Sequence, residues 1–313
     1  MEIINGIENI KGRFKNPVVT IGNFDGIHLA HRSIFEKVIE RARAIDGESI
    51  VITFEPHPIK LFQPTVILPL ITSYEKKIQL IEEVGVSTLI RIDFTKEFAN
   101  ISARDFIIEI LCHKIGMKEI VVGYDCSFGK NRQGNANLLQ EMAKDLGFKV
   151  HVMEPMKLNG TPVSSTKIRE MIKDGQVKEA KRLLGRNYQI RGNVIKGRDR
   201  GGRLLSFPTA NLKWTDELFP KVGVYTVLVK HKGTTYQGVA NIGYSPTFGN
   251  KTLSIETHIL DFNHDIYDEA IEIGFVDRLR DEKKFSNPEE LTEQIKIDIE
   301  RARNLFKMET NEA

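Results

Sequence analysis

The chain has 313 residues, 41% of them hydrophobic, which is enough for about two domains with sizeable cores. Lys and Arg number 45 against 42 Asp and Glu, and the resulting net charge of +3 argues against a dedicated nucleic-acid-binding protein. Two cysteines are too few for a disulfide framework, and no apolar run is long enough to span a bilayer. Since no signal peptide is evident either, we expect a cytoplasmic protein.

The first half of the sequence has the pattern of an α/β domain. Short apolar runs, which we predict to be strands, alternate with segments of helical periodicity. The predicted strands cover residues 18–21, 50–54, 88–92, 120–122 and 150–153, and the predicted helices include residues 103–115 and 137–146. This alternation is typical of a doubly wound parallel sheet, in which ligands gather at the carboxyl ends of the strands.

The segment after the first predicted strand has the features of a phosphate site. Gly22 and Gly26 lie in the loop, and glycines allow backbone N–H groups to approach an anion. A helix follows at once; its positive dipole end favours an anion, and His28 and His31 can donate hydrogen bonds to phosphate oxygens. The alternative is that two histidines at a helix start are ordinary surface residues. A metal site would need further ligands, and none is evident nearby.

The second half of the sequence has a different pattern, in which polar and apolar residues alternate. The predicted strands cover residues 188–195, 225–229, 236–241, 255–260 and 270–275, which indicates an antiparallel β-barrel. A closing helix is predicted after them, with Asn287 as N-cap, Pro288 as first residue and Glu290 as capping partner. The change of pattern predicts a boundary near residues 185–187, and hence two domains, 1–185 and 186–313.

Thr209 and Asn211 lie two positions apart, after a run rich in glycine and arginine. Alternate side chains of an extended segment share a face, so these two side-chain oxygens can converge on one point. Mg²⁺ prefers oxygen ligands and usually takes only one or two protein groups together with substrate phosphates, so the pair suits a magnesium–nucleotide site. The alternative is an ordinary Pro-Thr turn with a capping Asn.

Taken together, these motifs resemble those of the bacterial bifunctional riboflavin kinase/FAD synthetase (FMN adenylyltransferase) family. The resemblance covers essentially the whole chain, through motifs at residues 22–31, 53–58, 122–129, 164–169, 207–211 and 254–258. Two positions differ from the family pattern. Ala30 stands where the His-x-Gly-His signature has glycine, and Cys126 stands where an aromatic residue is usual.

The resemblance implies that residues 1–185 form an FMN adenylyltransferase domain, in which a phosphate oxygen of FMN attacks the α-phosphorus of ATP and pyrophosphate leaves. His28 and His31 would be the catalytic donors to the transition state. The ATP-binding residues would be Gly22, Asn23, Phe24, Asp25, Ser165, Thr166 and Arg169, and the flavin-binding residues Phe62, Tyr124, Asp125 and Phe128. Taken alone, residues 164–169 also suit a simple helix N-cap, and the phenylalanines also suit a hydrophobic core.

The resemblance implies that residues 186–313 form a riboflavin kinase domain, which transfers the γ-phosphate of ATP to the 5′-hydroxyl of riboflavin. Glu256 would be the general base, Thr209 and Asn211 would hold Mg²⁺, and Gly197 and Arg203 would bind ATP. On alternation alone, Glu256 is a solvent-facing strand residue, and residues 196–203 could be a short RNA-binding Arg-Gly segment.

The expected substrates are therefore ATP, riboflavin and FMN, and neither nucleic acid nor a membrane is expected as a partner. Two alternatives remain open. One is a riboflavin kinase whose first domain is impaired, and the other is a non-catalytic module that binds flavin nucleotides. The presence of Glu256 argues against the second alternative, because a binding module has no need of a general base.

Overall fold

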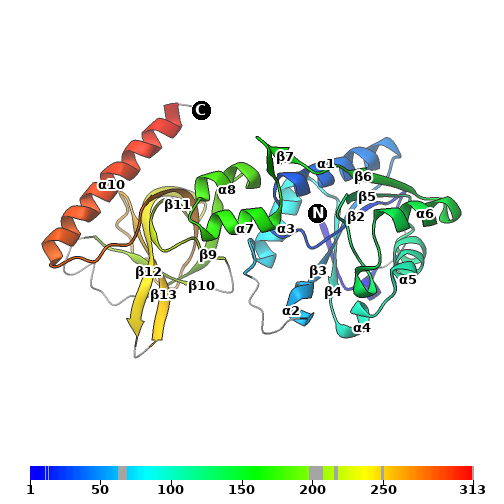
Figure 1. Ribbon diagram of the computed structural model, residues 1–313, viewed down its shortest axis with the longest axis horizontal. Coiled ribbons are helices and arrows are strands. Elements are labelled where there is room, and N and C mark those ends of the chain that lie inside the picture. The colour runs from blue at the N-terminus through cyan, green and yellow to red at the C-terminus, as the bar shows by residue number, and fades with distance from the viewer. Residues whose placement is uncertain are drawn as a thin grey trace. The chain divides into compact units, whose positions relative to one another are not determined.

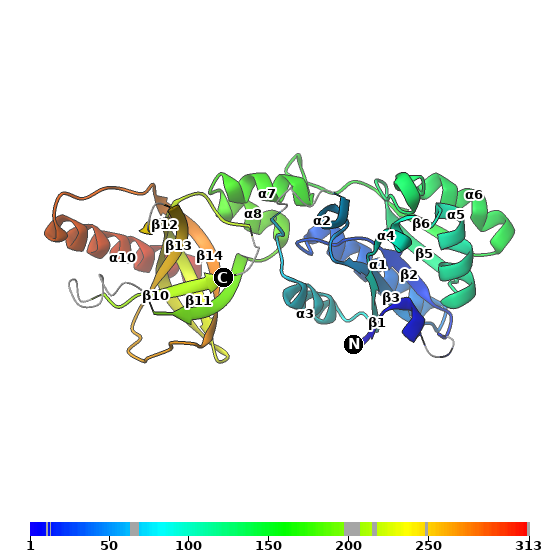
Figure 2. The ribbon, with the colours of Figure 1, turned by 90° about the horizontal axis from the view of Figure 1, so that it is seen from below.

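The protein divides by its internal contacts into two compact units, Met1–Ser165 and Thr166–Ala313. Figure 1 and Figure 2 show each unit in two orthogonal views of the computed structural model. The structure describes residues 1–10, 12, 14–62, 69–196, 207–214, 218–247 and 250–311. Each unit has its own architecture.

The first unit is built on a six-stranded sheet in which all neighbours are parallel, in the order β1-β4-β3-β2-β5-β6. The strands are β1 (Glu2–Asn5), β2 (Val18–Ile21), β3 (Ser49–Glu55), β4 (Thr88–Asp93), β5 (Glu119–Gly123) and β6 (Lys149–Met153). The five predicted strands and the parallel sheet are confirmed. The short edge strand β1 was not predicted, because four residues give too little alternation to recognise.

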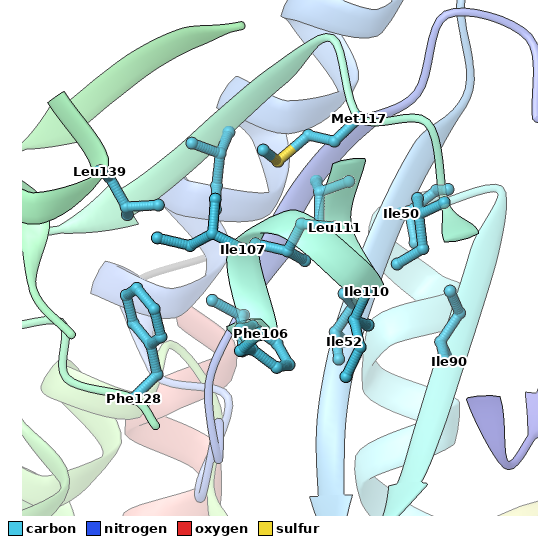
Figure 3. Close-up of a cluster of buried hydrophobic side chains, with 14 of the residues drawn as sticks. Ile50, Ile52, Ile90, Phe106, Ile107, Ile110, Leu111, Met117, Phe128 and Leu139 are labelled. Carbon is cyan, nitrogen blue, oxygen red and sulfur yellow. The ribbon is translucent and has the colours of Figure 1, made fainter. Parts of the chain in front are cut away.

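Helices cover both faces of this sheet. This is required because successive residues of its strands point to opposite faces and are apolar on both. On one face, Val18 and Val51 pack with side chains of α1 (Leu29–Ala44) and α3 (Tyr74–Val84). On the other face, Val19 and Ile52 pack with α5 (Ala103–Asp105), η2 (Phe106–Lys114) and α6 (Ala136–Leu146). Figure 3 shows the second cluster, with Phe106, Ile107 and Leu111 among the strand isoleucines.

The helix predicted over residues 103–115 is present, but most of it is a π-helix. The backbone N–H of Ile115 donates to the carbonyl of Ile110, five residues back. The remaining elements of this unit are η1 (Ile7–Asn9), α2 (Pro58–Phe62), α4 (Lys96–Ala99), η3 (Lys130–Arg132), β7 (Lys157–Leu158) and β8 (Thr161–Pro162).

The strand order indicates where in the sheet the ligand crevice is expected. From β2 the chain adds β3 and then β4 on one side, whereas β5 and β6 lie on the other side. The switch point therefore lies between β2 and β5, where ligands of open α/β sheets bind at the carboxyl ends of the strands. Gly22 follows β2 and Tyr124 follows β5, so two of the predicted loops begin at this switch point.

The second unit is a closed barrel in which all neighbouring strands are antiparallel, in the order β10-β13-β12-β11-β14-β9. The strands are β9 (Tyr188–Ile195), β10 (Ala210–Trp214), β11 (Gly223–His231), β12 (Thr234–Thr247), β13 (Asn250–Ile259) and β14 (Ala270–Arg280). The predicted barrel and its five predicted strands are confirmed. The strand β10 was not predicted as an element, although it contains Asn211.

Two helices precede the barrel, α7 (Ser165–Lys173) and α8 (Val177–Leu184), which ends at Gly185 in the left-handed conformation. The helix α8 contacts β14 and β9, and its residues Leu183 and Leu184 are buried. For this reason residues 166–185 group with the barrel, whereas the sequence pattern placed them with the first domain. The boundary at residue 185 stays a prediction about independent folding.

A long helix, α10 (Pro288–Asn311), closes the second unit along the outside of the barrel (Figure 1). Its start has the predicted cap, because the side chain of Asn287 accepts from the N–H of Glu290 at 2.8 Å and the Glu290 carboxylate accepts from the N–H of Ser286 at 3.1 Å. Ala302 and Phe306 pack on the barrel. The helix also carries Asp298, which is buried and forms an ion pair with Arg280 of β14 at 2.7 Å.

Candidate active sites

The loop that follows β2 is held in an unusual backbone conformation. Phe24 and Ile27 have positive φ values of 47° and 37°, and Gly26 has a φ of 89°. The ring of Phe24 is buried, with its centroid 5.3 Å from that of His31 and 4.8 Å from that of Phe35. A Cβ atom at Gly22 would lie 2.9 Å from the Phe24 ring, so this position requires glycine. The buried side chain of Phe24 therefore supports the loop, and only its backbone is placed to contact ATP.

His28 and His31 come together at the start of α1. His28 is the N-cap residue, and its Nδ1 accepts a hydrogen bond from the N–H of His31 at 3.4 Å. The two imidazole rings are stacked, with centroids 3.6 Å apart and planes 19° from parallel. Because Nδ1 of His28 is an acceptor, the ring proton of a neutral His28 lies on Nε2, which can donate to a phosphate oxygen.

The carboxylate of Asp25 is used to hold two segments of the first unit together. It accepts hydrogen bonds from the N–H of Ile71 at 3.0 and 3.1 Å and from the N–H of Thr72 at 3.2 Å. In return, the hydroxyl of Thr72 accepts from the N–H of Gly26 at 3.1 Å. Asp25 therefore positions the loop, and its carboxylate is surrounded by protein donors.

Two further predicted residues of this site are Asn23, in the loop itself, and Ser165, which contacts it. The side-chain oxygen Oδ1 of Asn23 is buried and has no hydrogen-bond partner within the described ranges of the chain, as expected for an atom that meets a donor of a bound ligand. The hydroxyl of Ser165, at the start of α7, donates to the backbone carbonyl of Asp25 at 2.8 Å. Thr166 and Arg169 follow on the same helix, and Arg169 shares a helix face with Ser165.

A buried lysine of the same region was not predicted from the sequence. Lys77, on α3, is only 4% exposed. Burial lowers the pKa of its ammonium group, while the nearby carboxylates of Asp25 and Glu55 act in the opposite direction. The helix therefore places a buried amino group close to the residue that holds the loop.

The four predicted flavin contacts differ in their surroundings. Phe62 is 63% exposed and Tyr124 is 57% exposed, and Asp125 is exposed as well. Phe128, by contrast, is 7% exposed and its ring packs on Phe106 within the core (Figure 3). In this arrangement Phe62 offers a ring face to a ligand, whereas the ring of Phe128 serves the core.

Cys126 lies between these residues and is half-buried. Burial raises the pKa of its thiol to about 12, with a smaller contribution from the charge of Asp125. A thiol with such a pKa stays protonated at neutral pH and acts as a small apolar side chain. The position that is usually aromatic in the family is thus occupied by an inert group.

The second group of predicted residues lies on the barrel. Asn211 of β10 pairs directly with Glu256 of β13. Their neighbours Ala210 and Thr257 are buried in the barrel, so Asn211 and Glu256 both face outward. Thr209 precedes β10 by one residue and alternation gives it the same direction as Asn211. The structure thus brings together the predicted base and the predicted metal ligands. Gly197 and Arg203 lie outside the described residues.

The residues at this place fit a magnesium–nucleotide site. In the described part of the chain, no three His, Cys, Asp or Glu side chains gather where they could hold a metal ion. A metal held by Thr209 and Asn211 would therefore need substrate oxygens to complete its coordination, which is the way Mg²⁺ usually binds with nucleotides.

Comparisons with known proteins match both units. The family model for FAD synthetase matches residues 11–167, and the family model for riboflavin kinase matches residues 184–306. A bifunctional riboflavin kinase/FMN adenylyltransferase of Buchnera aphidicola subsp. Acyrthosiphon pisum is 38% identical over 314 residues, covering 99% of this chain and 100% of the relative. The chain belongs to the bifunctional riboflavin kinase/FMN adenylyltransferase family.

Other relatives agree with this family. The bifunctional riboflavin kinase/FMN adenylyltransferase of Escherichia coli K12 is 34% identical over 308 residues, which are 98% of each chain. A crystal structure from Streptococcus pneumoniae has the same fold, with a TM-score of 0.89, 32% identity and coverage of 97% of this chain and 99% of that chain. That pneumococcal protein is named a macrolide-efflux protein. Within the described ranges of this family member, no helix has both the length and the hydropathy of a membrane span.

The residues that sequence reasoning missed share one property, which is that their partners are distant in the sequence. Thr72 pairs with Gly26 and Asp25 across 46 residues or more, and Lys77 approaches Asp25 in the same way. Asn241 of β12 pairs with Glu256 on the side away from Asn211. Only a knowledge of strand register could have identified this last residue, because Asn241 looks like an ordinary strand residue in the sequence.

Proposed function

We propose that this family member makes FAD from riboflavin in two ATP-dependent steps, with FMN formed on the barrel unit and FAD formed on the parallel-sheet unit. The observation that carries this proposal is the agreement between each unit and one family model, together with full-length relatives that carry both activities in their names. ATP, riboflavin and FMN are the small-molecule substrates.

In the kinase step, Glu256 accepts the proton of the riboflavin 5′-hydroxyl as this oxygen attacks the γ-phosphorus of ATP and ADP leaves. Its outward position beside Asn211 supports this role. Thr209 and Asn211 hold Mg²⁺, which supplies neutralisation of phosphate charge when it is bound. Gly197 and Arg203 are proposed to contact the ATP phosphates.

In the adenylyl-transfer step, a phosphate oxygen of FMN attacks the α-phosphorus of ATP and pyrophosphate leaves. His28 and His31 donate hydrogen bonds to the phosphate oxygens on which negative charge develops. Their stacked rings at the helix start support this role, since the two imidazoles lie together where the helix dipole favours an anion.

The ATP of this second step is bound by the loop after β2 and by the start of α7. The proposed contacts are Gly22, Asn23, Phe24, Asp25, Ser165, Thr166 and Arg169, of which Phe24 acts through its backbone and Asp25 through its hold on the loop. The flavin is bound by Phe62, Tyr124, Asp125 and Phe128. The exposed ring of Phe62 supports it as the main stacking surface, and Phe128 supports the site from the core.

We also propose a cytoplasmic location. Cys112 and Cys126 are both free thiols, as is usual in a reducing compartment.

One experiment tests the function directly. Purified full-length protein is incubated with riboflavin, ATP and Mg²⁺, and riboflavin, FMN and FAD are separated by chromatography over time. We expect FMN to appear first and FAD to follow. A second incubation that starts from FMN isolates the adenylyl transfer, and a third without ATP is the control. FMN formed from riboflavin, with no FAD in either incubation, would indicate an impaired first unit. Neither FMN from riboflavin nor FAD from FMN would indicate a binding module.

A further inference from the structure

Three polar residues form one row across three neighbouring strands of the barrel. Asn211 of β10 pairs with Glu256 of β13, and Glu256 pairs in turn with Asn241 of β12. Glu256 is therefore flanked by an amide side chain on each side. Residues directly opposite each other in antiparallel strands have Cβ atoms about 4.5–5.5 Å apart, which is within reach of a side-chain hydrogen bond.

The burial of the neighbouring residues fixes the direction in which this row points. Ala240 and Ile242, which flank Asn241 in β12, are both fully buried in the barrel. Ile255 and Thr257, which flank Glu256, are fully buried as well. Asn241 and Glu256 therefore point away from the barrel interior, on the same face as Asn211.

A second carboxylate lies on the other side of Asn241. A Cβ atom built at Gly243 would lie 2.6 Å from Oε1 of Glu282 and 3.4 Å from Nδ2 of Asn241. The Glu282 carboxylate thus covers Gly243, two residues along β12 from Asn241, and the amide group of Asn241 lies beside it. Asn241 is placed between Glu256, across the ladder, and the carboxylate of Glu282, which follows β14 in the sequence and reaches Gly243.

This position suits Asn241 for orienting the carboxylate of Glu256. A general base must present one carboxylate oxygen to the hydroxyl that it deprotonates, and its second oxygen needs a donor that fixes the group. Asn211 is occupied by the proposed metal site. The amide of Asn241 is a donor on the opposite side, and being neutral it separates two carboxylates that would otherwise repel each other.

We propose that Asn241 is a positioning residue for riboflavin phosphorylation, which orients the carboxylate of Glu256. The proposal rests on the role of Glu256 as general base. Loss of a hydrogen bond from Asn241 to the charged Glu256 should lower kcat by about ten-fold to a hundred-fold. The KM values for riboflavin and ATP should stay nearly unchanged, because Asn241 acts on the reacting geometry.

The test compares two substitutions of Asn241 in the full-length protein. Asn241→Leu keeps the branched shape and removes the donor, whereas Asn241→Ser retains a hydroxyl donor. We expect Asn241→Leu to lower the kcat of FMN formation and Asn241→Ser to restore part of it. The matched control is Asn193→Leu, since Asn193 is an exposed asparagine of β9 that pairs with Lys213 and Ala270. Thermal unfolding of the same samples reports whether the barrel is folded, and FAD formation from FMN reports the state of the first unit.

A double-mutant cycle separates this proposal from the role of Glu256 itself. If Asn241 acts through Glu256, Asn241→Leu costs less than about two-fold in kcat when it is added to Glu256→Gln, because coupled residues are not additive. Equal losses in both backgrounds, a rise of KM in place of the fall in kcat, or a loss no larger than that of Asn193→Leu would each overturn the proposal. If Glu256→Gln alone leaves FMN formation intact, the assignment of the base is wrong, which is a different outcome.

Discussion

Asn211 and Glu256 lie directly opposite each other on the antiparallel strands β10 and β13. This pairing places the proposed metal ligand, the amide oxygen of Asn211, beside the proposed general base, the carboxylate of Glu256, on one outward face of the barrel. The backbone pairing of the two strands therefore sets the distance between the proposed metal and the proposed base.

We predict that Glu256→Gln lowers the rate of riboflavin phosphorylation by about 10²–10⁴, the usual contribution of a general base. FMN adenylylation should stay within a few-fold of the unsubstituted protein, because the substitution lies in the other unit. Both rates are measured by separating FMN and FAD. The control is Glu272→Gln, since Glu272 is a barrel glutamate that bonds to Gln189. An equal loss of both activities in a folded protein would show that Glu256 acts through structure.

We predict that Thr209→Ala and Asn211→Ala each raise the Mg²⁺ concentration needed for half-maximal FMN formation. Each substitution removes one oxygen ligand from a site that takes only about one or two protein ligands. The measurement is a Mg²⁺ titration at saturating ATP and riboflavin. A titration curve that coincides with that of the unsubstituted protein would remove the residue from the metal site.

We predict that Ala30→Gly improves kcat/KM for ATP in FAD formation by roughly ten-fold or more, because a methyl group between the two histidines crowds the nucleotide by about 1–3 kcal/mol. Ala30 is the second residue of α1, so the same change should lower the free energy of unfolding by up to about 1 kcal/mol. Riboflavin phosphorylation is the internal control. If Ala30→Gly gains no activity, the pocket already accommodates the methyl group. The small side chain of Cys126, which stands where the family usually has an aromatic residue, would then be our explanation for the extra space.

We predict an acid-sensitive ion cluster in the first unit. The guanidinium of Arg41 bonds to the buried carboxylate of Glu119 at 2.8 and 3.0 Å, and Nε2 of His151 lies 2.7 Å from it. The bond from Arg41 is the largest cause that lowers the pKa of Glu119 from 4.5 to about 2. Because the pKa of Glu119 is lower in the folded state, its ionised form stabilises the fold at any pH above the unfolded-state pKa of 4.5. Up to about 3 kcal/mol of the free energy of unfolding is therefore lost as the pH falls from 4.5 towards 2.

Urea denaturation between pH 7 and pH 3 measures this loss. Glu119→Gln should be less stable at pH 7 and should depend less on pH in the acid range. Glu141→Gln removes an exposed ion pair with Arg104 and serves as the control with little effect. Parallel pH curves for the unsubstituted protein and Glu119→Gln would assign the acid sensitivity to other groups.

We predict that residues 1–185 and 186–313 fold separately and that the second piece makes FMN by itself, because each half has its own core pattern. A piece of residues 166–313 retains α8, which packs on β14 and β9, so it should melt at a higher temperature than 186–313. Thermal melts and the FMN assay compare the two pieces. Insoluble or inactive pieces from an active full-length protein would mean that the halves require each other.

Most of the fold could be predicted from the sequence because its signals are local. The strands β2 and β9 have the predicted bounds, and the cap at Asn287 is present as expected. The π-helix at Phe106–Lys114 could not be predicted, since its apolar spacing also suits an α-helix. The bonds of Asp25 to Ile71 and Thr72 were out of reach for a different reason, because tertiary packing alone joins segments 46 residues apart.

The helix α1 is fixed at both of its ends. His28 caps its start, and Arg41 in its last turn is bonded to Glu119, the first residue of β5. Each residue of an α-helix turns the chain by about 100°, so the deletion of one residue between these ends would change the orientation of the two histidines relative to Arg41 while every side chain of the site remained present. Under the proposed role of the two histidines, the length of α1 becomes a requirement for FAD formation, and we expect insertions and deletions to be tolerated in the surface turns of this unit and not in this helix.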